Sequence, residues 1–384
     1  MPRLGFIQAD EQAAKQQNSN LQAEETLALI LKIAGIWSDN ARCPDKMSKR
    51  ARVSIVKVQD FDNPYESVKE AVRLAGGFEE VVKTASSVTV KPNLVRIPKF
   101  MKGEIPKGAA TTFEVLDAVL KLTKERASKI SVIESDTLLG TAEQAFEKYR
   151  VPELAKKYGL ELINATKDEL VECEVPDPQF YVAVDGLRWL DPPEREMFAS
   201  DYVLRLSKRY LNSVRISVPS MKTQADPYSA ITFSVKNMFG VLPEVKKFLK
   251  FHEIKSWKGN KYNIGINVGR SLLDICQVAP PNYAIIDGLW GLHGPGSPGT
   301  GYSVKIGVII ASRDAWAADT VAGAIVGFDM RRLFYFRKAE SMGLGVTSLE
   351  NIEVKGEEIE SVKVPFELAV SLEAQRLLDE VAGR

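Results

Sequence analysis

The chain has 384 residues, of which 45% are hydrophobic and 26% are charged, a composition typical of a soluble globular protein with a sizeable core. A formal net charge of +1 provides no general attraction to nucleic acid or to an anionic membrane, so neither is expected as a partner. Three widely separated cysteines, Cys43, Cys173 and Cys276, predict free thiols and are too few for an intrinsic iron–sulfur cluster. The N-terminal sequence is unlike a secretory signal and no apolar run reaches about 20 residues, so a cytoplasmic protein is expected.

Residues 1–50 are predicted to form an N-terminal extension to a main domain over residues 51–384. Four apolar residues in the extension recur at helical spacing and predict a short amphipathic helix: Leu27, Ile30, Leu31 and Ala34. The apolar face of such a helix needs a cover, either from the main domain or from a second subunit. A homodimer through this helix is therefore one expectation.

Apolar strand-like runs alternate with helical patterns from residue 52 to residue 162. Strands are predicted over Val53–Val58, Ser87–Val90 and Ile130–Ile133, and helices over Pro64–Ala75, Thr112–Arg126 and Thr141–Tyr158. Thr111 is the expected N-cap of the second helix. Alternation of this kind indicates a parallel sheet with helices on its faces.

Residues 163–212 interrupt this alternation. Three short strands are predicted there, separated by turns rich in Pro and Asp: Glu172–Val175, Tyr181–Val184 and Tyr202–Leu206. We expect an inserted antiparallel β-rich flap, an element that often covers a site.

The α/β pattern resumes at Val214. Strands are predicted over Val214–Val218, Tyr283–Ile286 and Ile306–Ile310, and helices over Ser229–Gly240, Gly269–Val278, Ala315–Gly327, Leu333–Met342 and Phe366–Ala382. The predicted fold is therefore α/β: a mostly parallel open sheet with helices on both faces, plus the inserted flap.

Five of the predicted strands end in polar residues suited to ligand contact. The five segments are Lys91-Pro92-Asn93, Glu134-Ser135-Asp136, Ser220-Met221-Lys222-Thr223, Asp287-Gly288 and Ser312-Arg313-Asp314. Ligands of open α/β sheets bind beyond the carboxyl ends of the strands. The sequence therefore predicts a site along that edge, covered by the Gly- and Pro-rich segment Gly288–Gly301.

Three lysines are the expected anion-binding groups of this site. Lys91, Lys222 and Lys236 each stand beside or near a residue that can form hydrogen bonds, namely Asn93, Thr223 and Asn237. Together they could cradle a phosphate or a carboxylate. The alternative is three surface lysines that extend their charged ends into solvent.

Acidic residues offer two further roles. Glu134, Asp136 and Asp287 could hold a divalent metal such as Mg²⁺, or could simply form turns. Asp314 is most simply the N-cap of the helix that follows it, whereas Asp319 lies inside that helix and is expected to have a partner, either a lysine or a metal. Asp136, Asp287 or Asp319 would bind the divalent metal or act as a base. His252 and His293 are the only histidines and could shuttle a proton, with packing or surface roles as the alternative.

Two phosphate-binding signatures are incomplete. Residues Gly294–Gly299 have the G-x-G-x-x-G spelling, but a strand-like run follows where a dinucleotide-binding turn needs a helix. Lys222-Thr223 lacks the glycines that precede the lysine of a P-loop. A nucleotide-using transferase would have to bind its phosphates without a standard loop.

Taken together and in order, these segments resemble the DUF362 family of bacterial and archaeal proteins, a domain of unknown function. The resemblance spans roughly residues 52–350. It rests on Val90–Val95, Glu134-Ser135-Asp136, Val218–Thr223, Ser234–Gly240, Ile286-Asp287-Gly288, Gly294-Pro295, Ser312-Arg313-Asp314, Ala317-Ala318-Asp319 and Gly343-Leu344-Gly345. The family often has Gly-Asp-Ser in place of Glu134-Ser135-Asp136, and often His where this chain has Gln224.

The resemblance implies little about the reaction. Some relatives carry a ferredoxin-like iron–sulfur module, which hints at redox work, and this chain would need a separate electron-transfer protein for such work. The first hypothesis is an enzyme that binds an anionic small molecule, without an assigned reaction class. The alternatives are a non-catalytic binding or redox-partner accessory protein, and a nucleotide-using transferase without a P-loop.

Overall fold

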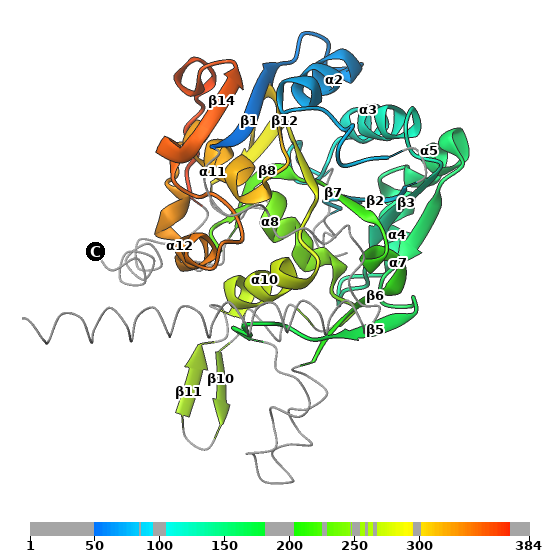
Figure 1. Ribbon diagram of the computed structural model, residues 1–384, viewed down its shortest axis with the longest axis vertical. Coiled ribbons are helices and arrows are strands. Elements are labelled where there is room, and N and C mark those ends of the chain that lie inside the picture. The colour runs from blue at the N-terminus through cyan, green and yellow to red at the C-terminus, as the bar shows by residue number, and fades with distance from the viewer. Residues whose placement is uncertain are drawn as a thin grey trace, which may run out of the picture. The chain divides into compact units, whose positions relative to one another are not determined.

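The computed structural model describes residues 50–83, 86–94, 105–180, 203–224, 229–245, 247, 254–257, 260–263, 267–294 and 301–368 (Figure 1). The predicted N-terminal helix, the predicted strand 181–184 and His252 lie outside these residues, as does most of the predicted helix 366–382. Cys173 and Cys276 are free thiols, as predicted. No helix among the described residues is long and apolar enough to cross a bilayer.

A large sheet forms the centre of the described chain (Figure 1). Its strands run in the order β14 (Ile352–Gly356), β1 (Ala51–Lys57), β13 (Tyr302–Ser312), β12 (Tyr283–His293), β7 (Val214–Val218), β2 (Ser87–Pro92), β3 (Lys129–Glu134) and β4 (Glu161–Asn164). Two short strands join this path at β12: β8 (Ser220–Thr223) pairs with β12, and β9 (Ile231–Thr232) pairs with β8.

Neighbouring strands of the main path are parallel except at β13, which is antiparallel to both β12 and β1. The predicted α/β fold with a mostly parallel sheet is thus confirmed. Because β13 runs the other way, its carboxyl end lies at the opposite edge of the sheet. The prediction that Ser312-Arg313-Asp314 joins the other four strand ends is therefore wrong.

The described part of the segment Gly288–Gly301, predicted as a covering loop, is mainly strand, and residues 295–300 of the segment lie outside the described residues. Gly288 to His293 belong to β12 and pair with residues of β13 up to the register pair His293–Tyr302. Leu289 and Leu292 are buried in this hairpin. Gly288 and Gly291 make this part of β12 difficult to predict from the sequence, because a glycine has no side chain to contribute to the apolar and polar alternation of a strand.

Alternation along the strands produces two cores, one on each face of the sheet. Ile285 and Ile309 belong to one cluster, whereas Ile286 and Ile310 belong to the other. The first core takes residues from α2 (Tyr65–Leu74), α3 (Phe113–Lys124), α4 (Ala142–Lys148) and α5 (Val151–Tyr158). The second takes residues from α8 (Ser234–Asn237), α10 (Asn267–Val278), α11 (Ala315–Ile325) and α12 (Phe334–Ser341). Helices therefore cover both faces, as predicted.

Two predicted helices are shorter in the structure. The helix predicted over residues 141–158 is interrupted at Arg150, which has a left-handed φ of 58°, and α5 begins with a proline in its first turn. Proline fits the first turn of a helix but not its interior, so a new helix has to start there. The helix predicted over residues 229–240 becomes β9, the four-residue α8 and a 3₁₀ turn at Met238–Val241.

The inserted flap is present in part. β5 (Leu170–Cys173) pairs antiparallel with β6 (Leu204–Ser207) as a separate two-stranded sheet. A second antiparallel pair joins β10 (Ile254–Trp257) to β11 (Asn260–Asn263). A short helix, α7 (Lys208–Leu211), leads from β6 back to the central strand β7.

Candidate functional site

The strand order explains why the predicted site residues meet. β7, β2 and β3 are adjacent and parallel, so their carboxyl ends lie side by side at one edge of the sheet. Lys91 stands near the end of β2, and Glu134 is the last residue of β3. The chain leaving β7 enters β8, which carries Lys222 and runs parallel to β12. This is the arrangement in which an open sheet places its ligand.

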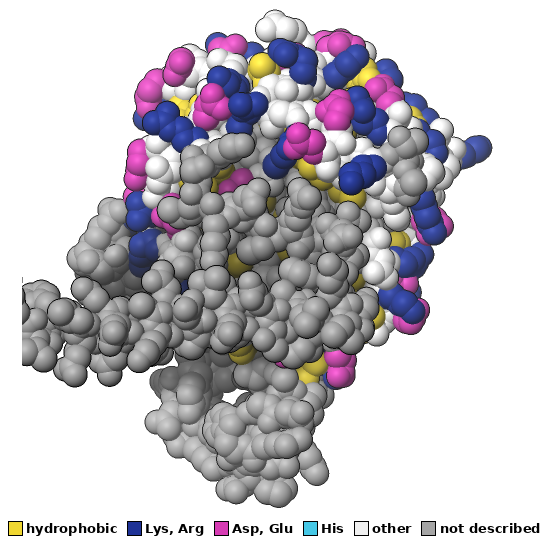
Figure 2. Space-filling model, viewed as in Figure 1, with side chains coloured by type: hydrophobic (Ala, Val, Ile, Leu, Met, Phe, Trp, Pro, Cys, Tyr) yellow, Lys and Arg dark blue, Asp and Glu magenta, His cyan; other side chains and the backbone are white. Residues whose placement is uncertain are grey.

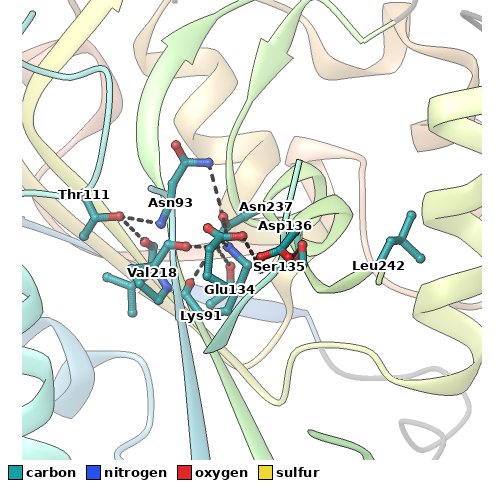
Figure 3. A network of polar contacts seen from close by, with 12 residues as sticks. Lys91, Asn93, Thr111, Glu134, Ser135, Asp136, Val218, Asn237 and Leu242 are labelled. Atoms are coloured by element: carbon teal, nitrogen blue, oxygen red, sulfur yellow. Dashed lines mark hydrogen bonds and ion pairs between the residues drawn. The ribbon is translucent and has the colours of Figure 1, made fainter. Parts of the chain in front are cut away.

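Lys91 and Glu134 form a buried ion pair at this edge (Figure 3). Lys91 Nζ lies 3.1 Å from Glu134 Oε2, and the side chains are only 2% and 5% exposed. The other carboxylate oxygen, Oε1, accepts a hydrogen bond from the Ser135 amide at 2.9 Å, and Lys91 Nζ also donates to the Pro92 carbonyl at 2.6 Å. Such additional bonds are what make a desolvated ion pair tolerable.

Two asparagine side chains connect this ion pair to Lys222 (Figure 3 shows the two amides). Lys222 Nζ donates to Asn93 Oδ1, and Asn93 Nδ2 donates to Asn237 Oδ1 at 3.3 Å. Asn237 Oδ1 also lies 3.5 Å from Lys91 Nζ. The amide group of Asn237 is fixed in turn, since its Nδ2 donates to the Lys91 carbonyl at 2.7 Å.

Thr111 holds the Asn93 backbone in place. Its Oγ1 accepts a hydrogen bond from the Asn93 amide at 2.8 Å and donates to the carbonyl of Val218, at the end of β7, at 2.6 Å. The structure assigns the N-cap of α3 to Thr112 instead, one residue after the predicted Thr111. Thr111 therefore links the segment that follows β2 to the end of β7.

Lys222 is buried without a carboxylate partner in the described part of the chain. Its side chain is 1% exposed, and its second hydrogen bond goes to another neutral oxygen, the carbonyl of Ala109. Burial lowers the pKa of Lys222 well below its usual value, and the positive charges of Lys236 and Lys91 lower it further. Glu134 acts in the opposite direction and does not compensate. Among the described residues, two lysines and one carboxylate thus act on Lys222.

The three lysines of the site lie in the interior of the protein and not on its surface. On the face shown in Figure 2, basic and acidic side chains are interspersed over the described surface. Lys91, Lys222 and Lys236 are all buried, with Lys236 the most exposed at 8%. The alternative of three surface lysines in solvent is therefore wrong for this fold.

Asp319 holds the helix that carries Lys236 and Asn237. Its Oδ1 and Oδ2 each accept a hydrogen bond at 2.8 Å, from the amides of Ser234 and Val235. Burial raises the pKa of the Asp319 carboxyl well above its ordinary value, although the two amides oppose the change. The partner of the Asp319 carboxylate is thus the pair of backbone amides at the start of α8. Lys236, on the same helix, donates a hydrogen bond to Ser229 Oγ.

The predicted metal ligands Glu134, Asp136 and Asp287 have separate partners. Asp136 Oδ1 accepts from the Ala142 amide and from Asn164 Nδ2, both at 2.8 Å. Asp287 Oδ2 accepts from the Thr112 amide at 2.7 Å, at the N-terminus of α3. Over the described residues, no three His, Cys, Asp or Glu side chains are grouped to hold a metal. Each of these carboxylates thus has a structural partner in the described chain, and a metal bound by them stays a prediction.

The structure also describes two other predicted residues, His293 and Thr223. His293 Nδ1 accepts a hydrogen bond from the Glu367 amide at 3.2 Å, and its ring stacks on Phe366 with centroids 5.1 Å apart. Thr223 is fully buried in β8, opposite Ile231 of β9. Successive residues of a strand face opposite sides, so Thr223 points away from the side that Lys222 occupies.

Sequence reasoning missed Lys247 and Gly240. Lys247 is 3% exposed and its Nζ donates to Ser135 Oγ at 2.9 Å and to the Asp136 carbonyl at 2.7 Å, so it fixes the segment after β3. A Cβ on Gly240 would lie 2.7 Å from Lys91 Cε, so glycine is needed for close approach. The Lys-Asn-Met-Phe-Gly run contained a signal for Gly240, whereas the mixture of apolar residues and lysines around Lys247 contained none.

Comparison with known proteins gives three findings. The family "Domain of unknown function (DUF362)" matches residues 88–324. The "Thylakoid-associated protein sll1697" of Synechocystis sp. is 25% identical over 303 residues, which cover 78% of this chain and 81% of that protein. A crystal structure of a protein from Thermotoga maritima aligns with a TM-score of 0.30 and 10% identity, covering 63% of this chain and 55% of that chain, so the match spans about half of the solved chain.

Proposed function

This chain belongs to the DUF362 family, and we propose that it is an enzyme whose sheet edge binds a small molecule bearing a phosphate or a carboxylate. The observation that carries the proposal is Lys222, a buried lysine that has no carboxylate partner within the described residues and lies among like charges. A buried lysine either has an anionic partner or gives up its proton, because an uncompensated buried charge is costly. An anionic ligand would supply the negative charge that Lys222, Lys91 and Lys236 together lack, since Glu134 is the one carboxylate among the described groups that act on Lys222.

The surrounding groups fit this role. Lys91 and Lys236 are close enough to Lys222 to lower its pKa, so an anion beside Lys222 would be attracted by these two neighbouring lysines. The amides of Asn93 and Asn237 are held by hydrogen bonds on both sides, so the cluster is already ordered before a ligand arrives. Fixed charges in a desolvated site are the largest contribution that such a site can make to stabilising a transition state.

The test is a thermal-shift panel on the full-length, metal-stripped protein, with inorganic phosphate, phosphorylated metabolites, nucleotides, carboxylates and divalent metals. Binding to the folded state raises the melting temperature by mass action. We expect at least one anion to stabilise the wild type and to have no effect on Lys222→Met. Methionine is preferred to alanine, because truncating a side chain that is 1% exposed leaves a cavity.

Lys129→Met is the matched control, because its side chain is 61% exposed. This variant should keep the full ligand-induced shift. Equal shifts in Lys222→Met and in the wild type would overturn the assignment of the site. Failure of every anion to bind would overturn the proposal itself, and stabilisation by nucleotides alone would favour the transferase alternative.

A second candidate is a non-catalytic accessory protein, and the name of the thylakoid-associated relative supports the association that such a role requires. The expected cytoplasmic location stays a prediction, since that relative is named as thylakoid-associated. Deleting residues 1–45 separates the two functions. Loss of assembly with retained anion binding would assign docking or dimerisation to the N-terminal extension and leave the anion site in the main domain.

A further inference from the structure

The hydrogen bonds of Lys222 match an uncharged amine. Its Nζ has two described partners, Asn93 Oδ1 and the Ala109 carbonyl, and both are neutral acceptors. An ammonium group has three N–H donors, so one donor would remain without a partner in a site that is 1% exposed. A neutral amine has two N–H donors, which these two oxygens satisfy, and its lone pair remains available.

We propose that Lys222 acts as a nucleophile in this form and forms an imine with the carbonyl carbon of an anionic oxo acid or aldehyde. The proposal rests on the anion-binding function proposed above and names the substrate class of that same site. The anionic group of the substrate would lie against Lys91 and Lys236, and its carbonyl would face Lys222.

Charge supports this assignment. The charged groups that act on Lys222 are Lys236 from α8, Lys91 from β2 and Glu134 from β3. Burial and the two lysines lower the pKa of Lys222, and among the described residues Glu134 is the one group that raises it. Desolvation and neighbouring cations are the two known means of keeping a nucleophilic lysine uncharged. The lysines that attract the anion therefore also activate the amine.

Thr232 provides a hydroxyl group beside Lys222. The two residues are directly opposite each other in the antiparallel pair of β8 and β9, so their side chains share one side of the ladder. Thr232 is 3% exposed, and its Oγ1 has no hydrogen-bond partner within the described residues. Buried hydroxyls are normally bonded, so this one is suited to a ligand oxygen.

The proposed step needs no oxidant or reductant. The lone pair of Lys222 Nζ attacks the carbonyl carbon, a C–N bond forms, and the C=O π pair moves to oxygen. Transfer of a proton from nitrogen to oxygen gives a carbinolamine. Loss of one water molecule then leaves the C=N bond, and the Thr232 hydroxyl is placed to hydrogen-bond the departing oxygen.

The test uses glyoxylate, a small anionic aldehyde, with cyanoborohydride to reduce any imine to a stable carboxymethyl-lysine that peptide mapping can locate. Each unit by which the pKa of a lysine falls raises its uncharged fraction about tenfold near neutral pH. We therefore expect Lys222 to be modified at least about tenfold faster than exposed lysines such as Lys148 and Lys156. Formaldehyde, which has no anionic group, should show a smaller preference for Lys222.

Two variants and one binding measurement decide the outcome. Lys222→Arg should abolish the fast modification, and Thr232→Val should fold normally, because its hydroxyl has no described partner, but should slow modification of Lys222. Calorimetry with inorganic phosphate tests anion binding separately. Phosphate binding without preferential modification of Lys222 would overturn the imine alone, whereas absence of both would overturn the anion site as well.

Discussion

Asn93 Nδ2 donates a hydrogen bond to Asn237 Oδ1 at 3.3 Å, and this contact between two amides joins the lysines of the site (Figure 3). Asn93 accepts from Lys222 on its other side, and Asn237 lies against Lys91. A carboxylate in either position would neutralise a lysine. Amides instead hold the amino groups in place and leave their charge, or their lone pair, for another partner.

Changing one of these amides to a carboxylate should block the site. In Asn93→Asp, a negative charge next to Lys222 would raise the pKa of that lysine and compete with the ligand anion. We expect the phosphate affinity measured by calorimetry to fall by about tenfold or more, which corresponds to roughly 1.4 kcal/mol. Asn351→Asp, on an exposed turn, is the control and should bind normally. Unchanged affinity in Asn93→Asp would place the ligand elsewhere.

The buried ion pair should be more costly to break than to replace. Removing one member of such a pair typically costs about 3–5 kcal/mol, whereas replacing both can be nearly neutral. Glu134→Gln should therefore destabilise the protein strongly, and Lys91→Met combined with Glu134→Gln should recover much of the loss. Urea unfolding of the two single variants and the double variant measures the coupling. Additive effects would contradict a coupled pair.

Gly240 should be sensitive to a single added methyl group. A Cβ there would lie 2.7 Å from Lys91 Cε and Nζ and 3.1 Å from Glu134 Oε1. Overpacking of this kind typically costs about 1–3 kcal/mol, so Gly240→Ala should lower both stability and anion affinity. Gly159→Ala is the comparison, since nothing lies within 4 Å of its added Cβ and only its φ of 63° is strained. This variant should lose stability but keep the affinity.

Asp287 should make the protein less stable as pH rises through mildly acidic values. Burial raises its pKa to about 6 in the folded protein, above the unfolded value of about 3.9. Between these two values the unfolded chain releases its proton first, so the free energy of unfolding falls with rising pH by roughly 1.4 kcal/mol per unit. The contribution is fully present below about pH 4 and lost above the folded pKa of about 6.

Asp287→Asn should reduce this slope in urea unfolding measured from pH 4 to pH 7. The slope should not vanish, because Asp314, with its pKa also raised to about 6 by burial, remains. An unchanged slope in Asp287→Asn would show that the carboxyl of this residue titrates normally in the folded protein.

Local patterns predicted much of this architecture. The alternation of strands and helices predicted the mostly parallel sheet, because the period of apolar residues is a local property of a strand or a helix. The position of Lys91 and Lys222 at strand ends predicted that they would meet, because parallel strands end at one edge. Asp314 was correctly predicted as the N-cap of α11, since its oxygen accepts from the amides of Trp316 and Ala317.

Long-range partners could not be predicted in this way. Asp287 is hydrogen-bonded to Thr112, 175 positions away, and Asp319 to Ser234, 85 positions away. These two acids, which suggested a metal or a base, instead accept hydrogen bonds from amides at the N-terminal ends of helices. The direction of β13 is decided by its hairpin with β12, which the glycines concealed. The sequence by itself determined which residues lie at strand ends. Tertiary structure alone decided which neighbour each charge would have, because hydrogen-bond partners are chosen by proximity in space and leave no periodic trace along the chain.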